Sequence, residues 1–160
     1  MHDIFISYSK KDRKFAESLA NALTKEGFVV WWDIDIPTGK TFDNVIEKAI
    51  DNAKCVIVLW SKNSVTSEWV HIEAAEGKKR DILIPVRIED VEIPIAFRRR
   101  QTADLINWNN KSTDILFKRI IADVGRLIND DEPKIGQNNT FEETKKISGL
   151  VRKYFWLIII

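Results

Sequence analysis

The chain has 160 residues, of which 44% are hydrophobic and 31% are charged, and its formal net charge is +1. This length and apolar content suit one domain with a real core, and the small net charge gives no reason to expect a nucleic-acid partner. One cysteine excludes an intramolecular disulfide framework, and the two histidines give no zinc-ligand spacing, so we expect a cytoplasmic protein without a metal site.

Apolar and amphipathic segments alternate along most of the chain. Short apolar runs, rich in β-branched and aromatic residues, predict strands at 4–6, 28–32, 55–60, 82–88 and 105–108. Apolar residues at helical spacing predict helices that begin near Ser9 or Asp12, near Thr41 or Asp43, near Ser67 and near Ile115. The alternation predicts an α/β fold, a five-stranded parallel sheet in flavodoxin-like order with helices on both faces.

One helical stretch, residues 67–76, carries a carboxylate among apolar residues. On a helical wheel Glu73 falls between Trp69 and Val70, and His71 falls at the polar edge. Trp69 and Glu73 are four residues apart, so their side chains can touch. Three interpretations of such a carboxylate are open. It forms a buried hydrogen bond or salt bridge, or the helix is tilted so that the carboxylate is exposed to solvent. Alternatively, it is a functional acid held against an aromatic side chain in a cleft.

The position of this helix along the chain favours a site. In an open parallel sheet, ligands bind beyond the carboxyl ends of the strands, where the strand order reverses. In flavodoxin-like order the first and third strands flank that point. Ser7, Tyr8 and Ser9 follow the predicted first strand, and the helix with Glu73 follows the third. The topological rule and the helical wheel therefore converge on Glu73.

Residues 1–128 resemble Toll/interleukin-1 receptor (TIR) domains. Residues 5–9, Phe-Ile-Ser-Tyr-Ser, look like the first box of that family, and residues 33–42, with a proline and a glycine, look like its long loop after the second strand. Residues 67–73 are similar to the Trp-Val-x-x-Glu stretch of its third helix, and residues 105–108 resemble its last box.

The resemblance implies one of two classes of function. Some TIR domains are adaptors that associate with one another, whereas many bacterial, plant and axonal members cleave NAD between nicotinamide and ribose. We predict the enzymatic class: an NAD+ nucleosidase that gives nicotinamide and linear or cyclic ADP-ribose, is activated by self-association and serves antiphage or stress defence. The alternative is a non-catalytic TIR signalling or interaction module. NAD would be the substrate, and no cofactor is expected.

The resemblance also assigns roles to residues. The catalytic glutamate of the enzymatic members maps onto Glu73, and the tryptophan that precedes it by four residues maps onto Trp69. A carboxylate beside the ribose can stabilise the oxocarbenium-like charge that develops as nicotinamide leaves. Trp69 offers a face for stacking. Tyr8 and Ser9 are candidates for contacts with ribose or phosphate, and the alternative for both is helix capping and packing.

The loop after the predicted second strand supplies further candidates. Asp33 and Asp35 could meet the nucleotide, although carboxylates in turns often bond their own backbone. Phe42 could stack on the base, or be a core residue at the beginning of a helix. Three consecutive arginines, residues 98–100, could bind phosphate or a neighbouring subunit, or form a solvated face.

The last 32 residues differ in character from the rest. Residues 129–141 are polar and predict a linker, and residues 142–160 end in an apolar, aromatic run preceded by basic residues. This pattern resembles the cytoplasmic flank and first residues of a membrane span, but a full span needs about 20 apolar residues. We expect either a truncated transmembrane helix, which would place the domain on the cytoplasmic face of a membrane, or a tail that packs on a partner or on the domain.

Overall fold

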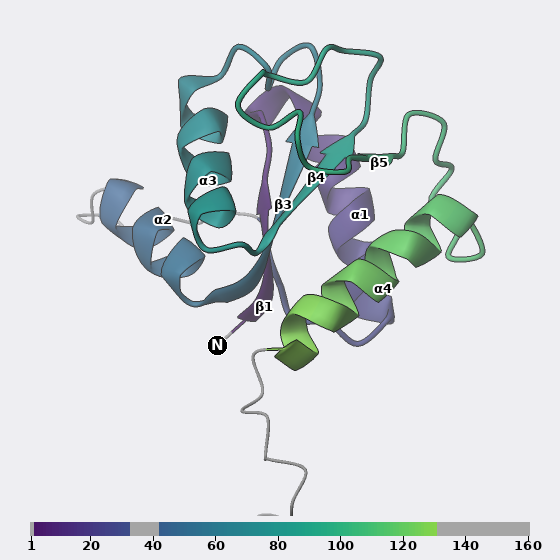
Figure 1. The fold of residues 1–160 in the computed structure, drawn as a ribbon. Coiled ribbons are helices and arrows are strands. Elements are labelled where there is room, and N and C mark those ends of the chain that lie inside the picture. Colours follow the sequence, from purple (N-terminus) through teal and green to yellow (C-terminus); the bar gives the residue numbers. More distant parts are fainter. Residues whose placement is uncertain (1, 33–41, 131–160) are drawn as a thin grey trace, which may run out of the picture.

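The structure, a computed structural model, describes residues 2–32 and 42–130, without the side chains at 42–44 and 130. The elements follow one another as β1 (His2–Ser7), η1 (Lys10–Asp12), α1 (Arg13–Lys25), β2 (Val30–Trp31), α2 (Phe42–Asp51), β3 (Ala53–Trp60), α3 (Glu68–Lys79), β4 (Leu83–Arg87), β5 (Ala103–Asp104) and α4 (Ile115–Asp130) (Figure 1).

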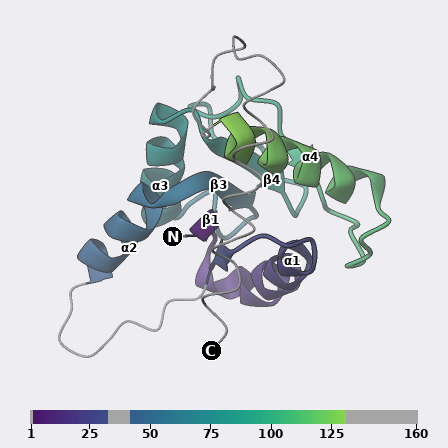
Figure 2. The same ribbon diagram turned by 90° about the horizontal axis from the view of Figure 1, so that it is seen from below.

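All five strands are parallel, in the order β2-β1-β3-β4-β5. Helices α1 and α4 cover one face of the sheet, and α2 and α3 cover the other (Figures 1 and 2). The α/β class, the flavodoxin-like strand order and the helices on both faces are therefore confirmed. Because β1 lies between β2 and β3, the strand order reverses between β1 and β3, and the carboxyl ends of these two strands mark the point where open parallel sheets bind ligands.

The alternation of side chains along β1 divides the core into two clusters. Ile4 and Ile6 pack with residues of α1 and α4, whereas Phe5 packs with residues of α2 and α3. Successive side chains of a strand point to opposite faces, so Ser7 shares the face of Phe5. The last residue of β1 thus points toward the α2–α3 side of the sheet.

The predicted first helix is confirmed, but its expected side-chain cap is not. Helix α1 ends before Gly27, whose φ of 95° is the left-handed conformation that glycine adopts most readily. At the other end, Ser9 and Asp12 occupy the N-cap positions of η1 and α1, yet neither side chain makes a capping hydrogen bond. The carboxylate of Asp12 is engaged instead by Ser61 and Asn63, in the loop after β3.

The fifth strand lies earlier than the sequence predicts. The ladder with β4 involves Ala103 and Asp104, whereas residues 105–108 form a turn. Leu105 and Trp108 are nevertheless buried, so the apolar pattern of residues 105–108 reflects burial in the core and not pairing as a strand. Pro85 of β4 is aligned with Val58 of β3, but on its other side it has no partner in β5, which pairs only with Val86 and Arg87. A proline in a strand is tolerated where no partner needs its missing N–H.

The C-terminal boundary of the domain also shifts slightly. Helix α4 runs to Asp130, so the first two residues of the predicted linker are helical. The rest of the linker and residues 142–160 lie outside the described residues, and the expected membrane segment stays a prediction. Within residues 2–32 and 42–130, no helix has the length and apolar character that crossing a membrane requires.

Candidate active site

A buried carboxyl group connects α3 to the carboxyl end of β1. Glu73 is 4% exposed, and the hydroxyl of Ser7, which is 1% exposed, donates a hydrogen bond to its Oε2. Glu73 belongs to the stripe of α3 that faces the sheet, together with Val70, Ala74 and Gly77. The helical wheel thus correctly placed Glu73 on the apolar face of the helix, and a tilted helix that exposes the carboxylate to solvent is excluded.

The environment of Glu73 changes its acidity. Burial raises the pKa of its carboxyl group from an ordinary 4.5 to about 7, while hydrogen bonds from the side chains of Ser7 and Trp69 lower the pKa in part. The group is therefore close to half ionised at neutral pH. A carboxyl with this pKa can change its protonation state during a reaction at physiological pH.

Two local features of α3 hold Glu73 at this depth. At the N-terminus, the Ser67 hydroxyl accepts a hydrogen bond from the Val70 N–H at 3.4 Å, which begins the helix before the buried stripe. In the last turns, a Cβ at Gly77 would lie 2.9 Å from Cβ of Val56 on β3. The absence of a side chain at Gly77 lets α3 approach the sheet closely enough for Glu73 to reach Ser7.

A polar network joins the loops after β1 and β3. The Ser61 hydroxyl donates to Asp12 Oδ2 at 2.5 Å, and Asn63 Nδ2 donates to Asp12 Oδ1 at 3.0 Å. The Ser64 hydroxyl accepts from the Ser61 N–H at 2.7 Å, which closes the turn. These residues were not predicted as part of the site. The only sequence signal was a polar run after a buried strand, which does not reveal a partner in another loop.

Trp69 lies where the sequence predicts. It is half-buried, packs against the α2–α3 core, and acts on Glu73 as a hydrogen-bond donor. The structure thus brings three residues together at the candidate site: Ser7, Trp69 and Glu73. Of these, Ser7 was expected only to border the mouth of the sheet.

Tyr8 and Ser9 are near the site in sequence but differ in orientation. The Tyr8 ring packs on the α1–α4 side of the sheet, with its centroid 6.3 Å from that of Trp32. Ser9 is half-buried, and its carbonyl accepts the Asp12 N–H at 2.7 Å. Their binding of ribose or phosphate stays a prediction. Asp33 and Asp35 lie outside the described residues, as does the side chain of Phe42.

His71 is less exposed than its position at the polar edge predicts. It is half-buried; its ring packs edge-on to Trp60 and Phe97, with centroids 5.5 and 6.0 Å away, and its Nε2 is 2.9 Å from the Val65 carbonyl oxygen. Phe97 belongs to the segment between β4 and β5. That segment covers the edge of α3, which periodicity within the helix cannot reveal.

Two of the three consecutive arginines have structural partners. Arg98 donates to the Ile93 carbonyl at 2.7 Å and pairs with Glu92, and Arg100 pairs with Asp81. Arg99 is exposed. These contacts favour a structural role for the run, with the arginines holding the segment between β4 and β5 against its neighbours.

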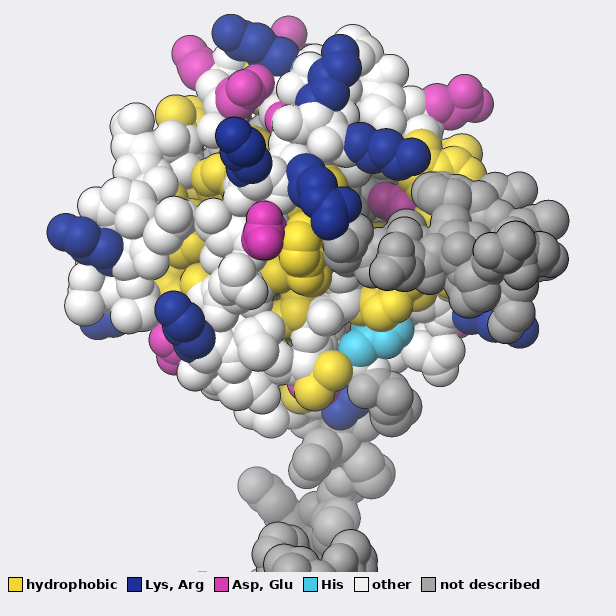
Figure 3. Space-filling model, turned by 180° about the vertical axis from the view of Figure 1, so that it is seen from behind, with side chains coloured by type: hydrophobic (Ala, Val, Ile, Leu, Met, Phe, Trp, Pro, Cys, Tyr) yellow, Lys and Arg dark blue, Asp and Glu magenta, His cyan; other side chains and the backbone are white. Residues whose placement is uncertain are grey.

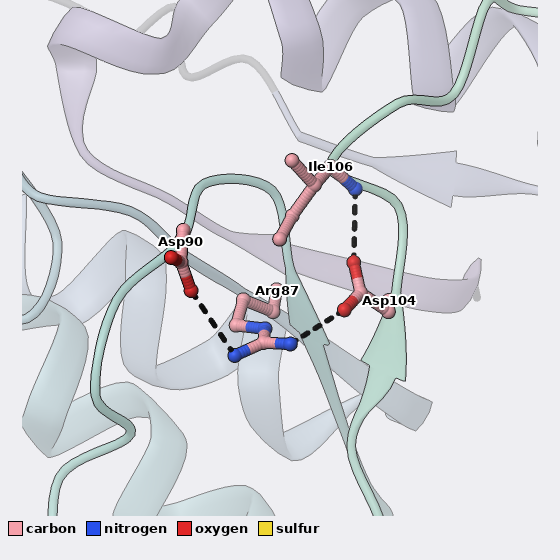
Figure 4. Close-up of polar contacts among 4 residues, drawn as sticks. All are labelled: Arg87, Asp90, Asp104 and Ile106. Atoms are coloured by element: carbon pink, nitrogen blue, oxygen red, sulfur yellow. Dashed lines mark hydrogen bonds and ion pairs between the residues drawn. The ribbon is translucent and has the colours of Figure 1, made fainter.

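The carboxyl ends of β4 and β5 are joined by an ion pair (Figure 4). Arg87 donates to Asp104 Oδ2 at 2.6 Å and lies 3.6 Å from Asp90, and Asp104 Oδ1 accepts the Ile106 N–H at 3.1 Å. Burial raises the pKa of Asp104, but the hydrogen bonds of Arg87 and Ile106 outweigh it, so the net pKa is lowered. This pair fixes the short β5 strand.

The described surface offers other features, none of which involves Glu73. A groove of about 980 Å³ lies between the edge formed by β4 and β5 and helix α4, and its lining includes Pro85, Thr102 and Leu127. On the face opposite to that of Figure 1, acidic and basic side chains are scattered without a single-sign patch (Figure 3). Within the described residues, no group of three or more histidine, cysteine or acidic side chains could hold a metal ion.

The fold and this site define a class: a parallel α/β domain with a buried carboxyl on the helix after its third strand. A family model described as the TIR domain matches residues 4–121. The chain therefore belongs to the TIR domain family.

Sequence and structure comparisons agree with this assignment. The chain is 32% identical over 101 residues, 57% of its length, to the "Probable 2' cyclic ADP-D-ribose synthase TcpO" of Methanobrevibacter olleyae, and covers 30% of that protein. It is 29% identical over 92 residues, 53% of its length, to the "2' cyclic ADP-D-ribose synthase BtTIR" of Bacteroides thetaiotaomicron, and covers 32% of it. The chain thus spans about a third of these curated relatives.

A solved structure with the same fold is the TIR domain of the Toll-related receptor TRR-2 from Hydra magnipapillata. The TM-score is 0.69 with 20% sequence identity, and the match covers 78% of this chain and 99% of the receptor domain. At this level of identity the likeness concerns the fold.

Proposed function

We propose that this TIR domain cleaves NAD at the bond between nicotinamide and ribose, with Glu73 as the catalytic residue. The observation that carries the proposal is the Glu73 carboxyl, buried on α3 and held by Ser7 at the reversal point of the sheet. The names of two curated relatives, both 2' cyclic ADP-D-ribose synthases, support an NAD-derived product. The role in antiphage or stress defence stays a prediction.

The chemistry suits a single carboxylate. When the glycosidic C–N bond breaks, its electron pair leaves with nicotinamide, and positive charge develops on the ribose as an oxocarbenium-like species. The positive charge thus moves from the nicotinamide ring to the ribose, so an ionised Glu73 beside the ribose would stabilise the transition state more than the ground state. Attack by water then gives ADP-ribose, whereas attack by a hydroxyl of the second ribose gives a cyclic product.

The pKa of Glu73 suits both parts of this reaction. The attacking water or hydroxyl must lose a proton, and a carboxylate with a pKa of about 7 can accept it at neutral pH. The nicotinamide ring of NAD is cationic, so bound substrate favours the ionised form of a nearby carboxyl. Half-buried Trp69, which contacts Glu73, offers an aromatic face beside it.

We further propose that self-association activates the domain, because family resemblance implies that the loop after the second strand completes the site of a neighbouring copy. The corresponding loop here lies outside the described residues. The alternative is a TIR interaction module without catalysis, which needs neither a buried carboxyl at this position nor its hydroxyl partner.

The experiment compares two substitutions on the same helix. Glu73→Gln keeps the size of the side chain but removes its charge, and we expect it to lower nicotinamide release by at least about a hundredfold. Glu76→Gln is the matched control, since Glu76 is only partly buried and pairs with Lys79 at the surface. The control should retain activity. Undiminished release by a folded Glu73→Gln variant would exclude the assignment.

A further inference from the structure

The proposed catalytic carboxyl is held by a hydroxyl from a different element. Ser7 is the last residue of β1, and its backbone is aligned with Val58 of the central strand β3. Glu73 lies 66 positions later in the chain, on α3. The Ser7 side chain is thus carried by a strand paired with the central strand of the sheet, while the group it contacts is on a helix that packs over the sheet.

The direction of this hydrogen bond determines what Ser7 can do. A serine hydroxyl donates its single proton to one acceptor, and here the acceptor is Oε2 of Glu73. Donation to a carboxylate is stronger than donation to a neutral carboxyl, so the bond favours the charged form. Both residues are at least 96% buried, so water does not compete effectively for the bond.

We propose that Ser7 is a positioning residue of the NAD-cleaving reaction: its hydroxyl fixes one oxygen of Glu73 and keeps the carboxylate form available beside the ribose. This inference rests on the proposed function of Glu73. Ser7 acts through Glu73, not through contact with NAD.

No charged side chain shares this task within the described residues. The shift in the pKa of Glu73 arises from burial and from two uncharged donors, Ser7 and Trp69. On the neighbouring helix α2, Glu47 and Lys48 are exposed, and the ring of His71 packs on Trp60 and Phe97. When the Ser7 hydroxyl is removed, the hydrogen bond from Trp69 still lowers the pKa of Glu73, but the contribution of Ser7 against the effect of burial is lost.

The test is the Ser7→Ala variant, studied as the full chain by two measurements. The first is the titration of the Glu73 carboxyl carbon by NMR with 13C-labelled glutamate, where Glu73→Gln identifies the signal. We expect the pKa to rise by about one unit in Ser7→Ala. The second is the rate of nicotinamide release against pH, whose midpoint should move by the same amount. Activity would then fall about fivefold at pH 7 and recover toward the wild-type value at alkaline pH.

Two further variants make the result specific. Ser7→Cys has nearly the same size and a weaker donor, so its titration should fall between those of wild type and Ser7→Ala. Ser18→Ala removes a hydroxyl that bonds only the Lys14 carbonyl on α1, and it should shift neither titration nor activity. If Ser7→Ala is too unstable to study, Ser7→Cys carries the test.

The outcomes separate this inference from the proposed function. An unchanged Glu73 titration in folded Ser7→Ala and Ser7→Cys, or a loss of activity of equal size at every pH, would overturn the role of Ser7. Absence of NAD cleavage by the wild-type chain would overturn the proposed function, and with it the role of Ser7 as a positioning residue of that reaction, even if the NMR titration still shifted.

Discussion

At the scale of single residues, the structure centres on a carboxyl group that is buried without a cationic partner in its hydrogen bonds. The donors to Glu73, Ser7 and Trp69, are uncharged, and the raised pKa shows that they compensate for burial only in part. Such a residue costs the fold stability whenever it is ionised. The proposed catalytic role gives a reason for this cost, because a cationic substrate beside Glu73 would stabilise the ionised carboxylate.

The first prediction concerns the pH dependence of stability. Between pH 4.5 and about 7, the unfolded chain releases the Glu73 proton while the folded protein keeps it, so rising pH lowers the free energy of unfolding. Above pH 7 the loss is complete, at roughly 3 kcal/mol. The side chain in Glu73→Gln cannot ionise, so the variant should not lose stability in this way. From pH 4 to pH 8, its free energy of unfolding should therefore increase relative to that of wild type by roughly 3 kcal/mol.

Urea unfolding at these two pH values measures the difference directly. Glu76→Gln serves again as the control and should follow the wild-type dependence, because Glu76 is only partly buried. Parallel pH dependence of wild type and Glu73→Gln would mean that burial does not raise the pKa of Glu73 above its value in the unfolded chain.

The sequence correctly predicted the buried position of Glu73 on α3, but it did not predict that Ser7 contacts it. The buried stripe of α3 follows from helical periodicity, so the anomalous position of Glu73 is visible in the sequence. Ser7 could be assigned to the mouth of the sheet because it follows an apolar strand. Its bond to Glu73 depends on how α3 packs over β1, and no local pattern encodes that contact.

At the scale of elements, the close packing of α3 against β3 sets the depth of the site. Gly77 is the point of closest approach, since a methyl group there would meet Cβ of Val56 and the side chain of Leu83. The neighbours are the central strand and β4, both of which are held by strand pairing. They cannot move away without disturbing the sheet.

Two glycine substitutions test this packing. Gly77→Ala should lower the free energy of unfolding by about 1–3 kcal/mol, because the helix must shift away from β3. Gly125→Ala is the matched control in α4: an added Cβ meets nothing within 4 Å, and the higher helix propensity of alanine should stabilise the protein by about 0.5–1 kcal/mol. Chemical denaturation of both variants gives the comparison. Equal effects of the two would contradict the packing account.

Helices and strands were predicted accurately where the apolar pattern extends over many residues, and poorly where a strand pairs through only two residues. The four helices were assigned from repeated apolar spacing, and the central strand from its continuous apolar run, residues 55–60. The fifth strand was misplaced because Leu105 and Trp108 are buried in a turn, while the residues that pair with β4, Ala103 and Asp104, have no strand-like pattern. A two-residue strand held by the Arg87–Asp104 ion pair leaves little signal in the sequence.

At the scale of the whole molecule, parallel topology gathers residues from distant parts of the chain at one edge. Ser7 is the last residue of β1, the Asp12–Ser61–Asn63 network joins the loops after β1 and β3, and Glu73 comes from α3. The strand order alone predicts that these segments meet. The side chains that make the contacts become known only once the sheet and helices are assembled.

Cleavage of NAD by the domain itself is best tested by measuring nicotinamide release by the wild-type chain over a series of protein concentrations. We expect release, with activity per molecule rising with concentration if self-association completes the site. A protein that is folded at every concentration, as shown by circular dichroism, yet releases no nicotinamide at the highest one would contradict the claim. That result would favour a TIR interaction module.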